Sequence, residues 1–120
     1  MPLLTAVLED AAREPIVRHE AAEALAAIGG AGLEAVLGRY CDDSAQEVAE
    51  TCQLALAKLQ WERQTGSGQP GNQYGSRDPA PPSTEGDTDK LARDLLNTNL
   101  SLFDRWVTLF SRFSAELCMQ

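Results

Sequence analysis

The only histidine of the chain is followed directly by a glutamate, and His19 and Glu20 are the best candidates for chemistry. Imidazole and carboxylate groups are both common ligands of divalent metals, and a non-heme iron site usually combines two histidines with one carboxylate. A single histidine cannot complete such a site without ligands from elsewhere. The simplest alternative is a solvated histidine in the first turn of a helix, so both interpretations stay open at this point.

The pair lies in the stretch EPIVRHEAAEALAAIG, residues 14–29, for which the sequence predicts a helix. Pro15 stands where a helix begins and Gly29 follows where it should end, which is the usual distribution of these two residues at helix ends. Between them, apolar residues recur at helical spacing and predict one buried stripe. The stripe consists of Val17, Ala21, Ala24, Leu25 and Ile28.

Successive residues of a helix are rotated by about 100°, which places His19 roughly 200° from Val17 and outside the stripe. In a helical repeat this face can line a concave binding groove. Neighbours one position apart diverge, so we predict that His19 and Glu20 are poorly placed to chelate one ion. They would reach two different ions, with other helices supplying the remaining ligands. The residues expected around the imidazole are Ala22, Glu23 and Ala26.

A second helix repeats this pattern 31 residues later. It is predicted to begin at a capping box, Ser44–Glu47, whose side chains would satisfy the free amides of the first turn. An offset of 31 aligns the first stripe with Val48, Cys52, Ala55, Leu56 and Leu59.

Shorter helices predicted at about 2–12 and 33–40 complete two helix pairs. The predicted fold class is therefore all-α, an α-solenoid of HEAT-like helix pairs. Because Glu50 and Thr51 occupy the positions of His19 and Glu20 in the second repeat, the His-Glu pair belongs to one repeat only.

The composition divides the chain into four parts. Residues 1–63 form two HEAT-like repeats, and residues 64–89 are a flexible linker, because they are rich in glycine and proline and poor in apolar residues. Residues 90–113 resume a helical pattern, and residues 114–120 are a divergent tail. The third part carries an aromatic stripe that needs a partner surface, which predicts self-association. The stripe consists of Phe103, Trp106, Phe110 and Phe113.

The net charge of −8 disfavours nucleic acid and membrane surfaces as partners and is compatible with a basic substrate. The three cysteines, Cys41, Cys52 and Cys118, are odd in number and lack C-x-x-C spacing, which predicts free thiols in a reducing compartment. Cys52 occupies a core position and is expected to be a buried structural thiol. We find no secretory signal and no apolar run of membrane-spanning length, and therefore expect a cytoplasmic protein.

Four motifs in order, EPIVRHEAAEALAAIG, EVAETCQLALAKLQW, DPAPP and SLFDRW..LF, resemble deoxyhypusine hydroxylase, a HEAT-repeat di-iron monooxygenase family. The resemblance extends from about Pro2 to Phe113. It implies that His19 and Glu20 are iron ligands, one of four His-Glu pairs that together hold two Fe(2+) ions. It also implies the family's reaction, hydroxylation of the deoxyhypusine side chain of translation initiation factor 5A to hypusine.

Three of the four His-Glu pairs have no counterpart here, and the tail Ser114–Gln120 departs from the family pattern. We therefore expect a truncated isoform or an incomplete gene model, whose activity requires the missing repeats or another chain. An alternative is a non-catalytic helical-repeat fragment that binds a protein. The stretch VRHEAAEAL also suits the related repeats of bilin lyases, but AETCQLAL and DPAPP favour the hydroxylase.

Overall fold

The computed structural model describes residues 2–66, 80–81 and 83–118, with side chains as far as residue 110. It divides into two compact units, residues 1–79 and 80–120, each described below by itself. Every regular element in these ranges is an α-helix, which confirms the predicted all-α class. None of the described helices is long and apolar enough to cross a membrane.

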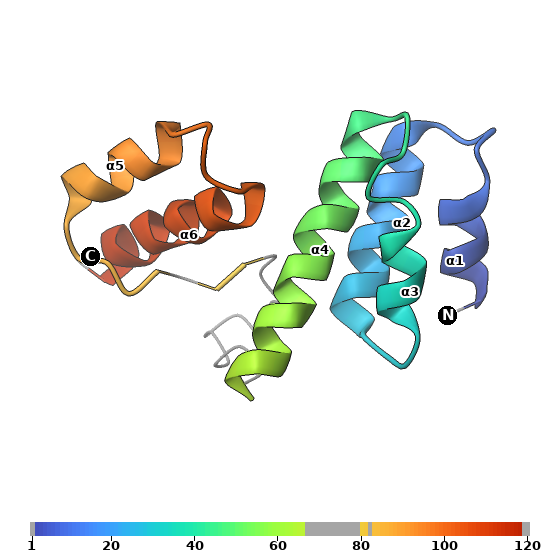
Figure 1. Cartoon of the computed structure of the whole chain (residues 1–120), viewed down its shortest axis with the longest axis horizontal. Helices are drawn as coiled ribbons and strands as arrows, with labels where there is room; N and C mark the ends of the chain where they lie inside the picture. The colour runs from blue at the N-terminus through green and yellow to red at the C-terminus, as the bar shows by residue number, and fades with distance from the viewer. Residues whose placement is uncertain (1, 67–79, 82, 119–120) are drawn as a thin grey trace. The chain divides into compact units, whose positions relative to one another are not determined.

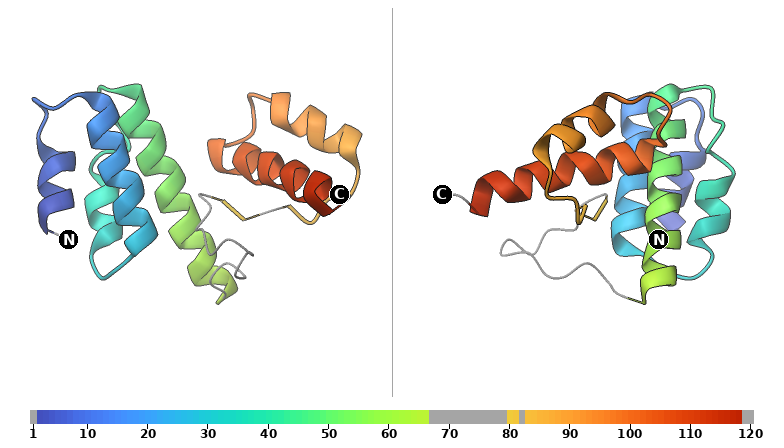
Figure 2. Two further views of the ribbon diagram at one scale, coloured as in Figure 1. Left: turned by 180° about the vertical axis from the view of Figure 1, so that it is seen from behind. Right: turned by 60° about the vertical axis from the view of Figure 1, so that its left-hand side comes forward.

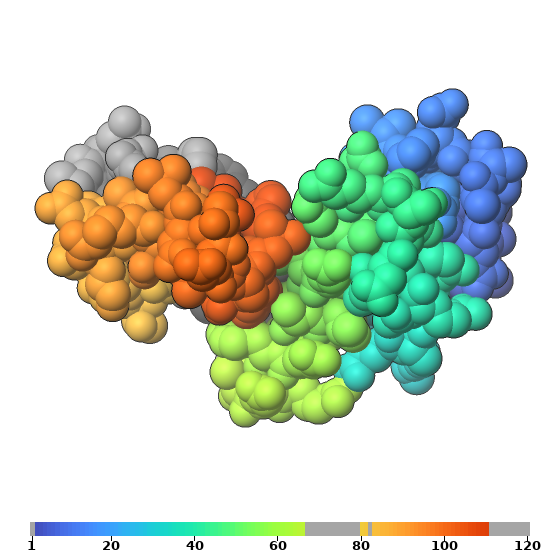
Figure 3. Space-filling model, turned by 45° about the horizontal axis from the view of Figure 1, so that its top comes forward, coloured from blue at the N-terminus to red at the C-terminus, as the bar shows by residue number. Residues whose placement is uncertain are grey.

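The first unit contains four helices, and α2 lies between α1 and α4 (Figure 1). Helix α3 packs mainly on α4, and in Figure 3 the side chains of α3 and α4 meet along one face of the unit. The succession short helix, long helix, short helix, long helix matches the two predicted helix pairs. The helices are α1 (Pro2–Glu9), α2 (Pro15–Ile28), α3 (Leu33–Gly38) and α4 (Gln46–Thr65).

The ends of α2 are as predicted, whereas the start of α4 is not. Pro15 opens α2, and Gly29 closes it with φ 73°, donating its backbone N–H to the carbonyl of Leu25. Helix α4 has Ala45 as its N-cap, and no side chain caps its first amides, so the predicted capping box is wrong. The carboxylate of Asp43 accepts the N–H of Ala45 at 2.9 Å, and the helix begins after this local turn.

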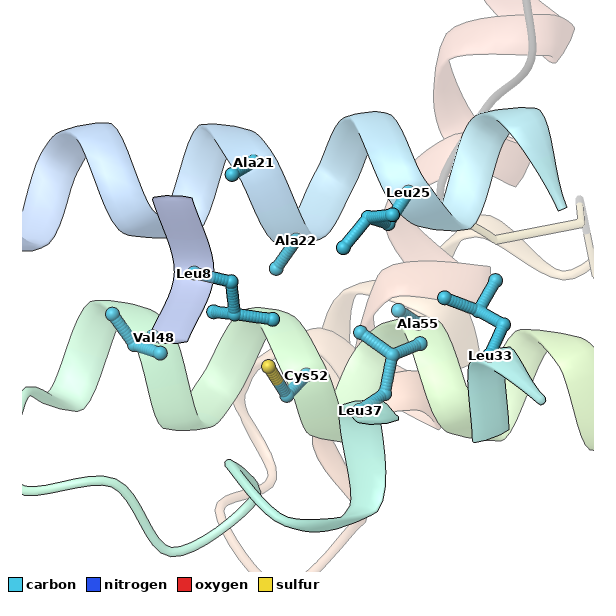
Figure 4. Close-up of a cluster of buried hydrophobic side chains, with 9 residues drawn as sticks. All are labelled: Leu8, Ala21, Ala22, Leu25, Leu33, Leu37, Val48, Cys52 and Ala55. Atoms are coloured by element: carbon cyan, nitrogen blue, oxygen red, sulfur yellow. The ribbon is translucent and has the colours of Figure 1, made fainter. Parts of the chain in front are cut away.

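The core of the first unit is a single cluster contributed by all four helices. In Figure 4 the side chains of α2 point toward those of α4, while Leu8 of α1 and two leucines of α3 fill the space beside them. Leu8, Leu25 and Leu37 are essentially inaccessible to solvent. The cluster consists of Leu8, Ala21, Ala22, Leu25, Leu33, Leu37, Val48, Cys52 and Ala55.

The buried face of α2 is rotated relative to the stripe expected from the sequence. Val17 and Ile28 are 42% and 60% exposed, whereas Arg18 and Ala22, both expected outside the stripe, are buried. Helix α2 packs on α1 and α4 together, so its buried face is centred between these neighbours.

The positions aligned by the offset of 31 have different surroundings in the two helices. In α4, Val48 is fully buried in the core and Leu59 packs against it. The aligned residues Val17 and Ile28 of α2 are exposed, because no described helix covers that side of α2. The two helix pairs therefore follow one another as the repeat predicts, but the stripe on α2 is only partly buried: Ala21 and Leu25 lie in the core, whereas Val17 and Ile28 are exposed.

The second unit contains a helix pair, α5 (Thr88–Leu96) and α6 (Leu102–Cys118), which run side by side in both views of Figure 2. Leu91 is buried, and the rings of Trp106 and Phe110 stack with their centroids 5.7 Å apart. The expected helix pair is thus present. The side chain of Phe113 and most of the predicted linker, residues 67–79 and 82, lie outside the described part of the chain.

Candidate metal centre

A buried ion pair fixes the rotation of α2 next to the candidate histidine. The Arg18 guanidinium donates Nη1 and Nη2 to the two carboxylate oxygens of Asp43, at 3.0 and 2.6 Å, while its Nε donates to the carbonyl of Leu8 at 3.0 Å. The two side chains are only 6% and 10% exposed. Arg18 therefore links α2 to the end of α1 and to the loop before α4.

The electrostatics of this pair follow from its hydrogen bonds. The hydrogen bonds from Arg18 hold the pKa of the Asp43 carboxyl below its usual value, with burial acting in the opposite direction and the N–H of Ala45 adding to the decrease. The same contact with Asp43 raises the pKa of Arg18 although burial opposes it. Both groups are charged near neutral pH, so the pair is a permanent electrostatic anchor for this part of α2.

His19 follows the anchored arginine and is held at the border between core and solvent. Its side chain is 23% exposed, and its Nε2 lies 3.3 Å from Oε1 of Glu20. Its other nitrogen, Nδ1, is buried and has no hydrogen-bond partner. A buried polar atom without a partner costs about 1–3 kcal/mol, so this imidazole is not explained by the stability of the fold.

The side chains of His19 and Glu20 are in contact, closer than the helical rotation of their backbones predicts. That they reach two different ions stays a prediction. The backbone directions do differ by the helical rotation, but the long and exposed Glu20 side chain bends back to the imidazole. Glu23 joins them, and one ligand atom from each of the three residues lies within 4.8 Å of the others. The arrangement offers one imidazole and two carboxylates to a single cation.

The sequence contained a signal for the third candidate metal ligand, Glu23. Glu23 follows His19 by four residues, so the two side chains lie on one face of α2, about one turn apart. The expected neighbourhood of the imidazole therefore included Glu23 correctly. It was wrong for Ala22, which points into the core and has no exposed surface. The anchoring pair of Arg18 and Asp43 could not be predicted from any local pattern.

These observations define a class of protein. The chain contains HEAT-like helix pairs, and one long helix presents a histidine and two glutamates whose donor atoms can meet at a divalent cation.

Comparison with known proteins identifies relatives over nearly the whole length of the chain. Over 111 residues the chain is 47% identical to deoxyhypusine hydroxylase of Gallus gallus and 45% identical to that of Homo sapiens. A solved structure of human deoxyhypusine hydroxylase in complex with glycerol is similar with a TM-score of 0.86 and 45% sequence identity. No protein-family model matches the chain.

The matched region is nearly all of this chain but little more than a third of each relative. Each sequence match covers 92% of this chain but only 37% of the relative, and the structural match covers 92% of this chain and 38% of the human one. Along nearly all of its own length, therefore, the chain is similar to one part of deoxyhypusine hydroxylase, and the resemblance predicted from its motifs is confirmed.

Proposed function

We propose that this chain is part of a deoxyhypusine monooxygenase, which hydroxylates the deoxyhypusine side chain of translation initiation factor 5A to hypusine. His19 and Glu20 are metal ligands in this proposal, and two Fe(2+) ions form the complete site. The observation that carries the proposal is the 47% identity to a deoxyhypusine hydroxylase over 92% of the chain, a stretch long enough to span His19 and Glu20.

The residues present fit a metal of this type. Neutral imidazole and carboxylate are the ligands that non-heme iron sites use, and both reach one another on α2. Because Nδ1 of His19 is buried, Nε2, which lies beside the Glu20 carboxylate, is the ring nitrogen that would bind a metal. Three donors on a single helix leave most of a coordination sphere open, so the proposal requires ligands from residues other than these.

Bound iron would supply the activation of dioxygen needed to insert an oxygen atom into a C–H bond. This chain would hold and orient the metal ligands on α2. Arg18 and Asp43 fix the rotation of α2, which sets the direction of His19. The net charge of −8 and the carboxylates of Glu20 and Glu23 favour the approach of a basic side chain such as deoxyhypusine. The cytoplasm, where a reducing environment keeps iron ferrous and thiols free, is the proposed location.

Metal analysis of the purified chain tests the proposal. The chain is loaded with ferrous iron under anaerobic conditions and desalted, and the retained iron is quantified for the parent, His19→Ala and Glu47→Gln. Glu47 is an exposed glutamate on α4, so its variant is a matched control for the loss of a surface group. Retention in the parent and control but not in His19→Ala supports the site, whereas equal retention in all three removes it.

A chimera tests the activity. Residues 2–66 replace the corresponding segment of the Gallus gallus hydroxylase, and the product is assayed on the deoxyhypusine form of the factor. We expect hydroxylation by the chimera and a loss of at least about 100-fold on His19→Ala, because no other imidazole of this segment can replace it. A chimera that folds and remains fully active after His19→Ala would refute the assigned role.

The alternative is a helical-repeat fragment that binds a protein and performs no chemistry. The exposed apolar residues Val17 and Ile28 on α2 favour it, because an uncovered apolar surface is typical of a protein-binding site. In that case deletion of 89–120 abolishes partner capture and His19→Ala leaves it intact. Light scattering of the parent chain over a range of concentrations tests self-association directly.

A further inference from the structure

We propose that Arg105 of α6 is a docking point for a carboxylate in the turn of a further helix pair, in the way that Arg18 of α2 binds Asp43. The partner has the chemistry of the α3–α4 pair, in which an aspartate precedes the long helix. The inference concerns the second unit and goes beyond the proposed function, because it does not depend on a metal.

Arg18 and Arg105 make the same contact within their own helix pairs. Each is the fourth residue of the longer helix, and each donates Nε to the carbonyl of a leucine 10 residues earlier, at 3.0 Å. The acceptors, Leu8 and Leu95, are the last residue but one of α1 and of α5. Carbonyl groups at such helix ends have no acceptor role within the helix, so the arginine satisfies them and links the short helix to the long one.

The residues around the two arginines correspond as well. Leu4 and Leu91 stand one helical turn before the acceptor leucines; Leu4 packs against the core of its unit and Leu91 is buried. Ala21 and Thr108 stand three positions after the arginines and are 4% and 6% exposed. Helix pair α5–α6 is therefore arranged like α1–α2. By this correspondence, the surface of α6 beside its arginine is the counterpart of the surface on which α2 packs with α4.

The two guanidinium groups differ at their outer edge. Arg18 donates Nη1 and Nη2 to the two carboxylate oxygens of Asp43. Arg105 is half-buried, and within the described part of the chain no hydrogen bond or ion pair engages its two Nη groups. A guanidinium presents these donors as a planar fork that fits a carboxylate through two parallel hydrogen bonds. The outer edge of Arg105 is therefore complementary to an aspartate placed like Asp43.

A peptide of residues 30–66 supplies a partner of this chemistry, since it contains α3, α4 and Asp43. The peptide is labelled with fluorescein, and its binding to the full chain is followed by fluorescence anisotropy. In the full chain the surface of α2 is already occupied by its own α4, which leaves the surface beside Arg105 for the peptide. We expect saturable binding that Arg105→Gln weakens at least about 10-fold, because a charge-assisted pair loses one partner.

The matched control is Arg13→Gln, which removes an equal charge from an arginine that is 52% exposed and pairs with Asp10. This variant should bind the peptide like the parent. Thermal unfolding followed by circular dichroism compares the stabilities of the variants. Arg105→Lys keeps the charge but lacks the fork, so it should also bind more weakly than the parent.

A second peptide that carries Asp43→Asn separates a direct contact from a defect in folding. The parent chain should bind this peptide at least about 10-fold more weakly than the first, whereas Arg105→Gln should bind the two peptides equally, since the contact is already lost. A purely structural role of Arg105 would weaken both peptides alike and leave the preference for Asp43 intact. That result, or no saturable binding to the parent chain, overturns the proposal.

Discussion

Replacement of Asp43 by asparagine is the strongest test of how this structure positions the candidate histidine. The substitution keeps the shape of the side chain and removes the charge that faces the buried Arg18 guanidinium. Removing one partner of a buried ion pair typically costs about 3–5 kcal/mol, because the other charge is left without compensation. The carbonyl of Leu8 continues to accept one hydrogen bond from Arg18, so we expect the lower end of this range.

The expected decrease in Tm is large for a unit of this size. In a domain of 60–100 residues each kcal/mol changes Tm by about 4–8 °C, so Asp43→Asn should lower Tm by at least about 12 °C. Urea unfolding followed by circular dichroism gives the free energy directly. The matched control is Glu9→Gln, which breaks the ion pair with Arg39, whose side chain is 60% exposed. That exposed pair contributes at most about 1 kcal/mol.

The stability difference between the parent and Asp43→Asn should also change with pH in a predictable direction. The pKa of Asp43 is lowered by folding, chiefly by its hydrogen bonds with Arg18, from an ordinary value of 3.8. Its contribution to stability is therefore fully present above about pH 5 and disappears as pH falls through the lowered pKa of the folded state. The difference in unfolding free energy between the parent and Asp43→Asn should narrow below pH 3.8. Equal stabilities of Asp43→Asn and Glu9→Gln at pH 7 would refute the anchoring role of the pair.

Three further predictions concern the core and the site. Burial raises the pKa of the Cys52 thiol to about 12, so a thiol reagent at pH 8 should modify the partly exposed Cys41 before Cys52, and Cys52 only on unfolding. Comparable rates for Cys41 and Cys52 in the native protein, measured by mass spectrometry, would contradict this. Leu25→Ala should lower the free energy of unfolding by about 2–5 kcal/mol and Ile28→Ala by less than about 1 kcal/mol, because only Leu25 is in the core. Equal losses in urea unfolding would contradict the observed orientation of α2. His19→Leu should not lower Tm in metal-free buffer, since it removes an unpaired buried nitrogen, and a fall in Tm would show that the imidazole stabilises the fold.

Local sequence signals predicted the helices and several of their ends. Pro15 and Gly29 bound α2 because their backbone preferences act within a single turn, without help from distant residues. The burial of Cys52 was also predictable, because an uncharged residue at a core position of an amphipathic helix has one favourable environment. The candidate pair itself was found because the chain has one histidine.

The rotation of α2 could not be predicted, because it depends on a contact between residues 25 positions apart. On a helical wheel a charged residue such as Arg18 is expected to face solvent. Its burial is explained by the ion pair with Asp43, which a wheel of α2 does not contain. The same carboxylate accepts the N–H of Ala45, which displaces the expected capping box at the start of α4. One acidic residue in a loop thus accounts for two of the differences between expectation and structure.

The position of His19 follows from these long-range contacts rather than from its own interactions. Its neighbour Arg18 is tied to two other segments, and Ala22 on the adjoining face fills the core, so the imidazole has little freedom to move inward or outward. Stability alone would not place a histidine there, since one of its nitrogens is buried without a partner. A rigid helix that presents an energetically costly imidazole beside two flexible carboxylates is the arrangement that ligation of a cation requires, because the rigid donor sets the location and the flexible donors adjust to the ion.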